Sequence, residues 1–170
     1  EVDSMIGYHP HLPTRPREYP DSVAEAKVVK RRMLSPDREF FDLADVTPVT
    51  PFAHYLDSKG IPYDFEELRA VALQHNTVLL HLKDHYNRPR PHQVSDLIPA
   101  DSVSSATPAY PSGHAFQSYI LADYLGRKHP RHYFAFRRIA NRIADARVSV
   151  GLHYPSDNRE ARRLADHFIR

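Results

Sequence analysis

Proline constrains the fold of this chain more than any other residue, because 15 prolines divide its 170 residues into short segments. A proline fits the first turn of a helix, but it breaks a helix interior and removes a hydrogen-bond donor from a central strand. Four prolines fall within residues 1–20, so this stretch cannot form a regular helix. We expect residues 1–20 to form an extended N-terminal arm and residues 21–170 to form a single domain.

The segments between the prolines carry helical signals, and none of them predicts a strand convincingly. Capping residues stand before several segments, and apolar residues recur at steps of three and four. These patterns predict an all-α fold, a compact bundle of about six to seven helices. Helices are predicted, with approximate bounds, over residues 21–33, 64–87, 112–128 and 130–150, and a last helix is predicted after Pro155.

Composition and charge exclude several classes of protein. The net charge of +2 gives no case for binding nucleic acid, and no apolar run approaches the roughly 20 residues that cross a bilayer. The N-terminus lacks the basic and apolar pattern of a signal peptide. We therefore expect a soluble protein without a membrane span. A mature periplasmic or secreted form and a cytoplasmic protein both fit this sequence, and the oligomeric state is left open.

The stretch from Tyr110 to His114 is typical of a helix start that can bind an anion. Ser112 can act as the N-cap, and Gly113 permits close approach of a ligand or of another backbone. The first turn of a helix presents unpaired N–H groups and a partial positive charge. His114 is therefore placed to exchange a proton with an anion bound at this point.

The predicted helix after Pro130 carries an arginine where its pattern requires an apolar residue. Phe136, Ala140, Ile143 and Val150 form one stripe, and Arg147 falls on the same stripe. An arginine cannot shed its charge, so a buried one needs an acidic partner or a bound anion. A structural salt bridge is the alternative to an anion site, although the nearby Asp145 does not face the same way.

After Arg147 the sequence places a histidine, His153, and a carboxylate, Asp157, at a spacing that allows their side chains to touch. Pro155 can begin the last helix, which places Asp157 in its first turn with the carboxylate able to reach back to His153. Such a contact fixes the tautomer of the imidazole and raises its basicity. A histidine–aspartate pair of this kind can also be purely structural.

Two cations stand at the end of the helix predicted over residues 64–87. Lys83 lies at the edge of the buried stripe, and Arg90 follows it in a proline-rich segment. The alternative for Lys83 is a surface lysine near a helix C-terminus, where positive charge is favourable.

These stretches form three motifs: Lys83–six residues–Arg90-Pro91, then Pro111-Ser112-Gly113-His114, then Arg147–five residues–His153–three residues–Asp157. They supply three cations, helix N–H groups, one histidine oriented by a carboxylate and a second histidine, which suits phosphoryl transfer. In order and spacing the motifs resemble the signature of the type 2 phosphatidic acid phosphatase (PAP2) superfamily. That superfamily includes class A nonspecific acid phosphatases, lipid phosphatases and vanadium-dependent haloperoxidases. Only Arg90 fits the gap from Lys83, so the signature excludes Arg88-Pro89.

The resemblance implies a role for each matched residue. His153 would be the nucleophile that forms a phosphohistidine, Asp157 would hold it, and His114 would be the general acid for the leaving group. The cations make a metal and a cofactor unnecessary. The resemblance assigns phosphate binding to Lys83, Arg90, Ser112, Gly113 and Arg147.

The sequence departs from the family pattern at two points. The third motif usually begins with Ser-Arg, whereas here Ala146 precedes Arg147, and we expect this difference to affect packing more than chemistry. Residues 158–163 are polar where relatives usually have small or apolar residues. This polarity predicts an exposed terminal helix and argues against an integral-membrane lipid phosphatase, and the short length argues against the larger haloperoxidases.

The sequence thus predicts a soluble, metal-independent phosphatase that acts on a small phosphorylated substrate at mildly acid pH, with vanadate as an inhibitor. One alternative is a haloperoxidase that holds vanadate as its cofactor in the same site. Another is a non-catalytic module that binds anions. His81 and His85 have a spacing that can bind a metal on a helix, but no acidic residue completes such a site, and we expect no metal there.

Overall fold

The computed structural model describes residues 19–99 and 106–169. The arm predicted for residues 1–20 therefore lies, except for its last two residues, outside the described part of the chain.

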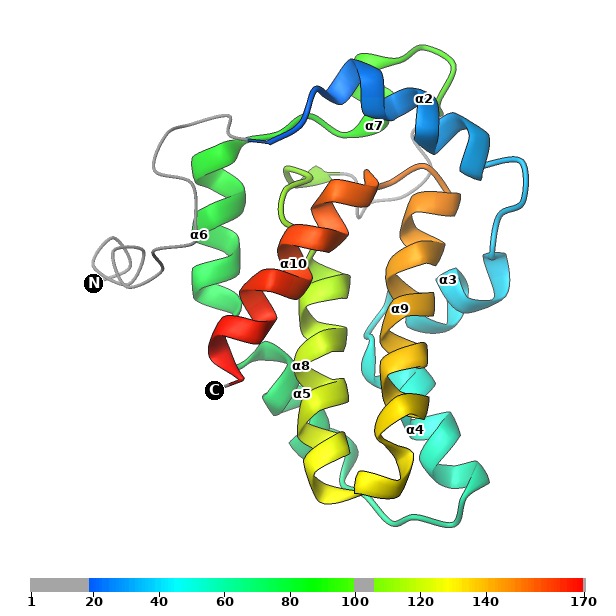
Figure 1. Cartoon of the computed structure of the whole chain (residues 1–170), viewed down its shortest axis with the longest axis vertical. Helices are drawn as coiled ribbons and strands as arrows, with labels where there is room; N and C mark the ends of the chain where they lie inside the picture. The colour runs from blue at the N-terminus through cyan, green and yellow to red at the C-terminus, as the bar shows by residue number, and fades with distance from the viewer. Residues whose placement is uncertain (1–18, 100–105, 170) are drawn as a thin grey trace.

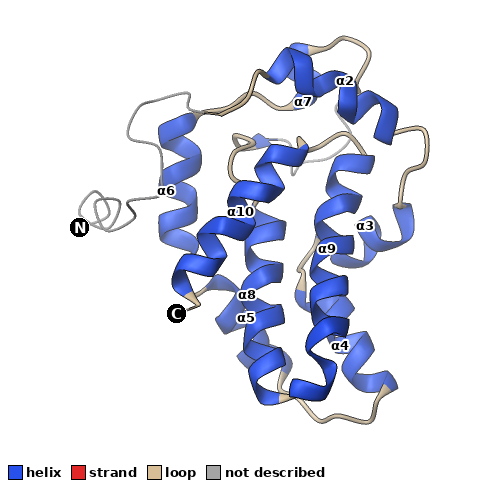
Figure 2. Cartoon of the chain, viewed as in Figure 1, coloured by secondary structure: helices blue, strands red, loops and turns tan. Residues whose placement is uncertain are grey.

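Every regular element in the described ranges is a helix, which confirms the all-α fold class (Figure 2). The elements are α2 (Ser22–Arg32), α3 (Arg38–Asp45), α4 (Val49–Ser58), α5 (Phe65–Leu73), α6 (Asn76–Tyr86), α7 (Pro91–Val94), α8 (Gly113–Lys128), the 3-10 turn η2 (Pro130–His132), α9 (Tyr133–Ser149) and α10 (Pro155–Phe168).

The prediction of one long helix over residues 64–87 is wrong, because two helices, α5 and α6, occupy this range. The chain leaves the helical conformation at His75, whose ring stacks on Phe168 with the centroids 4.0 Å apart. Apolar spacing does not reveal the break, since Leu68 on α5 and Leu79 on α6 are both buried in the same core. A continuous stripe therefore predicts one helix where two short helices share a buried side.

The centre of the bundle is the antiparallel pair α8 and α9, and α10 crosses α8 (Figure 1). Their apolar faces supply much of the core, because burial of large aliphatic and aromatic side chains is the main favourable term in folding. The fully buried residues of this contact include Phe116, Leu121, Phe136, Ile143 and Leu164.

The last helix, α10, is less exposed than its polar sequence predicts. Ala161, Leu164 and Ala165 are buried in the core, whereas Arg159 and Arg162 are exposed. The prediction of an exposed terminal helix is thus wrong for this inner face. Three small or aliphatic residues at helical spacing are enough to give a predominantly polar helix one side that packs.

Three helix ends meet at one end of the bundle. The first turn of α8, the last turn of α9 and the first turn of α10 lie together there, and α2 and α7 lie across this end (Figure 1). These are the positions to which the sequence motifs map.

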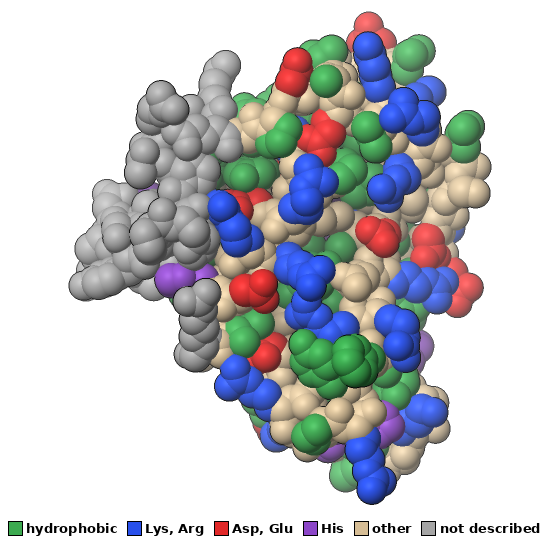
Figure 3. Space-filling view, viewed as in Figure 1, with side chains coloured by type: hydrophobic (Ala, Val, Ile, Leu, Met, Phe, Trp, Pro, Cys, Tyr) green, Lys and Arg blue, Asp and Glu red, His purple; other side chains and the backbone are tan. Residues whose placement is uncertain are grey.

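Within the described ranges, no helix is both long enough and apolar enough to cross a membrane. On the face drawn in Figure 3, Lys and Arg side chains are interspersed with acidic and apolar ones. The described part of that face therefore carries no continuous basic stripe of the kind that binds nucleic acid.

Candidate active site

The first motif supplies two buried cations. Lys83, in the last turn of α6, is only 5% exposed and donates a hydrogen bond to the carbonyl of Pro108 at 2.7 Å. The alternative of a surface lysine is therefore wrong. Arg90 caps α7 and donates to the carbonyls of Thr107 at 2.7 Å and Leu152 at 2.8 Å. These bonds direct both side chains into the protein.

His153 lies between a carboxylate and a guanidinium. Its Nδ1 is 2.8 Å from Oδ2 of Asp157, and its Nε2 is 3.0 Å from Nη1 of Arg90. A guanidinium nitrogen can only donate, so Nε2 must be the acceptor and Nδ1 must carry the hydrogen of the neutral ring. The same Asp157 oxygen also accepts from the N–H of Tyr154 at 2.9 Å. The free electron pair of His153 therefore faces a cation.

The second motif begins α8 as predicted. Ser112 is the N-cap, and its Oγ accepts from the N–H of Ala115 at 3.3 Å. Its own N–H donates to the carbonyl of Asp157 at 3.1 Å, which joins the starts of α8 and α10. A Cβ at Gly113 would lie 3.7 Å from Cε of Lys83, so the backbone of the second motif lies against the first motif.

Asp45, the last residue of α3, joins Arg147 to His114. Its Oδ1 is 2.9 Å from Nη1 of Arg147, and its carbonyl oxygen is 2.9 Å from Nε2 of His114. Because a carbonyl can only accept, Nε2 of His114 carries the hydrogen and Nδ1 is the nitrogen that titrates. Sequence analysis identified no acidic partner for Arg147, because Asp45 belongs to a distant helix.

Arg147 has one buried hydrogen-bond donor without a partner among the described residues. The residue is 1% exposed, and its Nε has no hydrogen-bond partner among the residues that the structure describes. Buried donors without partners are rare, and they are often explained by an ion or ligand. Arg147 therefore has both the acidic partner that sequence analysis considered and a donor left for an anion.

Burial and clustered positive charge lower the pKa values of the basic groups. Burial lowers the pKa of Lys83 to about 7, and the charges of Arg90 and Arg147 act in the same direction. Burial, followed by Arg147, lowers the pKa of His114 to about 4. The pKa of His153 lies well below its usual value because of burial and then of Arg90 and Lys83. An incoming anion would relieve this repulsion.

Asp157 is subject to opposing effects. Burial raises the pKa of its carboxyl to about 6, whereas Arg88, the hydrogen bond from Tyr154, Lys83 and Arg90 act to lower it. All its observed contacts are with donors, which is the pattern of an ionised carboxylate. Its charge therefore depends on the cations around it.

Arg88, which the signature excludes, is a buried partner of Asp157. Its Nη1 is 2.8 Å from Oδ1 of Asp157 and 2.6 Å from Oγ of Ser156. The guanidinium stacks over the ring of Tyr154, with 3.8 Å from Cζ to the centroid. No spacing in the sequence links Arg88 to Asp157, so sequence reasoning missed it.

His81 and His85, the pair of the metal alternative, both lie on α6. The ring of His85 packs edge-on against Tyr86 with the centroids 4.9 Å apart. Across residues 19–99 and 106–169, no three His, Asp or Glu side chains form a group that could hold a metal ion.

A comparison with models of protein families identifies the family to which the chain belongs. The model of the PAP2 superfamily matches residues 68–161, more than half of the chain, and the protein belongs to this superfamily. Membership of this superfamily supports a phosphatase-type activity. A search of curated proteins found no match. The matched segment contains all three motifs, but α2 and α3 precede it.

Proposed function

We propose that this protein is a metal-independent phosphatase that hydrolyses phosphomonoesters through a phosphohistidine on His153. The observation that best supports this proposal is the environment of His153. Its Nδ1 is held by Asp157, while Nε2 faces Arg90 in a buried cluster of cations. A nucleophile that is neutral and oriented by a carboxylate suits attack on phosphorus.

The phosphoryl group is bound by charge and by helix N–H groups. Lys83, Arg90 and Arg147 neutralise its nonbridging oxygens, and the unpaired Nε–H of Arg147 is one available donor. The hydroxyl of Ser112 and the N–H of Gly113, at the start of α8, complete the binding site. Because a phosphate monoester carries about −1.5 to −2 charges, it compensates most of the positive charge gathered here.

The reaction runs in two steps. Nε2 of His153 attacks phosphorus and the bond to the leaving oxygen breaks, while Asp157 stabilises the positive charge that develops on the ring. His114 gives its proton to the leaving alkoxide. In the second step His114 takes a proton from water, the resulting hydroxide attacks phosphorus, and the P–N bond breaks. Phosphate leaves and both histidines return to their starting state.

Substrate binding and protonation of His114 are coupled in this proposal. In the free protein the pKa of His114 is about 4, because of burial and the neighbouring Arg147. A bound phosphate dianion offsets the charge of Arg147 and raises the pKa of His114. Mildly acid solution favours the same protonated state.

The test is turnover of p-nitrophenyl phosphate and a panel of other phosphomonoesters between pH 4 and 8. The variant His153→Ala should lose at least about a thousandfold in kcat while remaining folded, because the covalent step is removed. His54→Ala, which changes an exposed histidine on α4, is the matched control and should keep wild-type turnover. Vanadate should inhibit the wild type.

Two results would contradict the proposal. One is a wild-type protein without turnover on the whole panel, and the other is His153→Ala with wild-type turnover. Oxidation of bromide by peroxide in the presence of vanadate, without phosphatase activity, would instead indicate a haloperoxidase.

A further inference from the structure

A chain of ionic contacts runs from His153 through the protein to α2. Asp157 accepts from Nη1 of Arg88 at 2.8 Å, and Nη2 of Arg88 donates to Oε2 of Glu25 at 3.0 Å. The side chains of Arg88 and Asp157 are fully buried, and that of Glu25 is 12% exposed. We call Glu25, Arg88 and Asp157 the ionic relay.

All five donors of Arg88 are engaged by the protein. Besides Asp157, Ser156 and Glu25, Arg88 donates from Nε to Oγ of Ser22 and from Nη2 to the carbonyl of Pro20, each at 3.1 Å. A guanidinium has five N–H groups, so none remains for a phosphate oxygen. Arg88 can therefore influence the site through Asp157, but not by contact with a substrate.

Glu25 also holds the first turn of α10. Its Oε1 accepts from the N–H of Ser156 at 2.7 Å, and its Oε2 accepts from the hydroxyl of Ser156 at 2.6 Å. The first N–H groups of a helix lack partners within the helix, so a carboxylate there is a cap and interacts favourably with the helix dipole. Ser156 directly precedes Asp157, and a cap supplied by α2 therefore orients the turn that carries Asp157.

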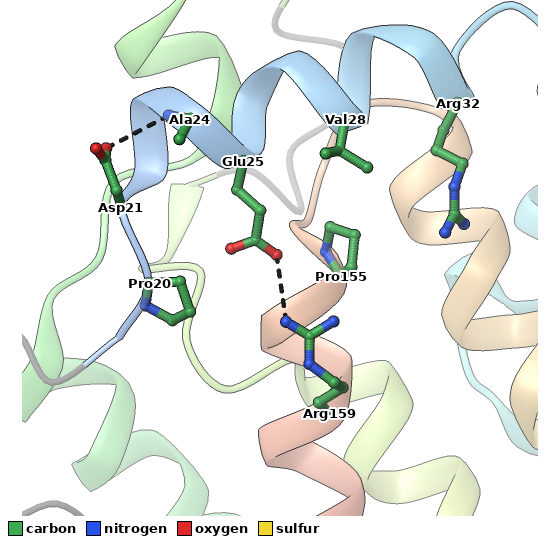
Figure 4. A pocket seen from close by; sticks show the side chains of 8 residues that line it. All are labelled: Pro20, Asp21, Ala24, Glu25, Val28, Arg32, Pro155 and Arg159. Carbon is green, nitrogen blue, oxygen red and sulfur yellow. Dashed lines mark hydrogen bonds and ion pairs between the residues drawn. The ribbon is translucent and has the colours of Figure 1, made fainter.

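Glu25 is the member of the relay that lies nearest the protein surface. It lines a surface pocket of about 450 Å³ between α2 and the start of α10. Figure 4 shows its carboxylate directed toward Arg159, with the nearest oxygen 3.8 Å from Nη2. Substitution of Glu25 therefore changes the surface end of the relay and leaves the two residues of the buried contact, Arg88 and Asp157, in the sequence.

We propose that Arg88 and Glu25 are positioning residues of the phosphatase, which hold Asp157 ionised and correctly oriented against His153. This inference rests on the proposed function of His153. It extends the site to α2, which lies outside the segment matched by the family model.

The physical reason is the cost of a buried, unpaired carboxylate. Without Arg88, Asp157 would keep Lys83 and Arg90 as neighbouring charges but would lose its only salt bridge to an arginine among the described residues. A carboxylate deprived of its buried partner takes up a proton more readily. A protonated Asp157 no longer favours the Nδ1–H tautomer of His153. A fraction of the molecules then carries the hydrogen on Nε2, which has no free electron pair in that tautomer.

The first test compares the kinetics of Arg88→Met, Arg88→Lys and Glu25→Gln. In Arg88→Met we expect kcat to fall about ten- to a hundredfold, with KM changed far less. Losses of this size are typical when a residue that orients a metal-binding side chain is replaced, and Arg88 orients Asp157 in a comparable way. The acid limb of the kcat/KM profile, where activity falls as Asp157 takes up a proton, should move to higher pH, since Asp157 protonates more readily. Arg88→Lys should recover part of the loss, and Glu25→Gln should show a smaller loss in the same direction.

The charged groups around the relay define the control. Asp157 is faced by Arg88, Lys83, Arg90 and His153, and Glu25 is faced by Arg88 and Arg159. The pair Asp123 and Arg127 on α8 lies outside this group, with 2.9 Å between the charged atoms. Asp123→Asn removes an ion pair of similar length and should leave kcat and the pH profile unchanged.

A double-mutant cycle tests whether Arg88 acts through Asp157. If it does, Arg88→Met should lower kcat much less in the Asp157→Asn background than in the wild type. An equal, additive loss in both backgrounds would overturn the proposal, and so would Arg88→Met with wild-type kcat and an unshifted acid limb. If Arg88→Met does not fold, Glu25→Gln decides, and wild-type behaviour of this variant would overturn the proposal.

A spectroscopic measurement separates this proposal from the proposed function. In protein labelled with ¹⁵N-histidine, the ring nitrogens of His153, assigned with His153→Ala, report its tautomer without any substrate. Arg88→Met and Glu25→Gln should shift these signals away from the Nδ1–H form, while Asp123→Asn should not. Unchanged signals would overturn the relay. Shifted signals in a protein without turnover would support the relay and contradict only the phosphatase.

Discussion

At the scale of single residues, Lys83 and Asp157 determine the expected pH dependence of the free enzyme. In the proposed mechanism Lys83, whose pKa burial lowers to about 7, binds phosphate in its protonated form, so activity should be lost as the pH rises above that value. In the same mechanism Asp157, whose pKa burial raises to about 6, holds His153 in its ionised form, so activity should be lost as the pH falls below that value. For p-nitrophenyl phosphate, whose leaving group needs no proton from His114, the profile of kcat/KM should be bell-shaped between these values, since it reports groups of the free enzyme.

The measurement is kcat/KM for p-nitrophenyl phosphate from pH 4.5 to 9. The variant Lys83→Arg separates the two limbs, because an arginine does not deprotonate in this range. Its alkaline limb should move to higher pH while the acid limb stays. An alkaline limb that does not move would show that another group causes it.

The role of His114 depends on the leaving group. Replacement of His114 by Asn removes the proposed proton donor, which should cost about 10² to 10⁴ in kcat for alkyl phosphates. The loss should be much smaller for p-nitrophenyl phosphate, because its stable phenolate leaves without a proton. The comparison of kcat for the two substrates checks this. Equal losses would point to a binding role for His114, through its contact with Asp45.

At the scale of elements, the turn from α9 to α10 depends on Gly151. Its φ is +87°, and a Cβ there would lie 3.0 Å from Sδ of Met33 and 3.1 Å from Cγ2 of Ile98. Gly151→Ala should lower the free energy of unfolding by about 2–5 kcal/mol, from the left-handed backbone and the crowding together. His153 follows two residues later, so kcat should also fall.

Gly60 provides the matched control for this turn. Its φ is +65°, but no atom lies within 4 Å of the added Cβ. Gly60→Ala should therefore cost only the backbone term, about 1–2 kcal/mol, and leave kcat unchanged. Urea unfolding of both variants measures the difference. A Gly151→Ala protein as stable as Gly60→Ala would contradict the role of crowding.

Local chemistry explains which elements were predictable. The start of α8 at Ser112 follows from capping, and the burial of Arg147 follows from the stripe on α9. Spacing did not reveal the break at His75, where the ring stacks on Phe168, a residue of α10 that is distant in sequence. Boundaries fixed by neighbouring residues can be read from sequence, whereas those fixed by tertiary contacts cannot.

At the scale of the whole molecule, sequence motifs predicted the residues that cluster but not those that support them. The three motifs lie between Lys83 and Asp157, and their spacing is a local property of the chain. Asp45 and Glu25 reach the site from α3 and α2, 102 positions from Arg147 and 131 positions from Ser156. No periodicity relates positions so far apart, so only the packing of the bundle reveals them.

The proposed anion-binding site also links the stability of the whole molecule to its ligand. A ligand that binds only the folded state raises the free energy of unfolding by about 2.7 kcal/mol at a hundred times its Kd. Vanadate at that excess should therefore raise the Tm of this chain by roughly 5–11 °C, given its size. Differential scanning calorimetry measures the shift.

Arg147 and Arg142, both on α9, distinguish specific binding from a general salt effect. Arg147 is buried in the site, whereas the side chain of Arg142 is 48% exposed and pairs with Asp37. Arg147→Met should abolish most of the vanadate-induced shift, whatever its own Tm, and Arg142→Met should retain it. An equal shift in both variants would mean that vanadate stabilises the protein elsewhere. Loss of the shift in Arg147→Met alone would mean that vanadate binds at Arg147, at the end of α9, where its charge offsets the repulsion among Lys83, Arg90 and Arg147.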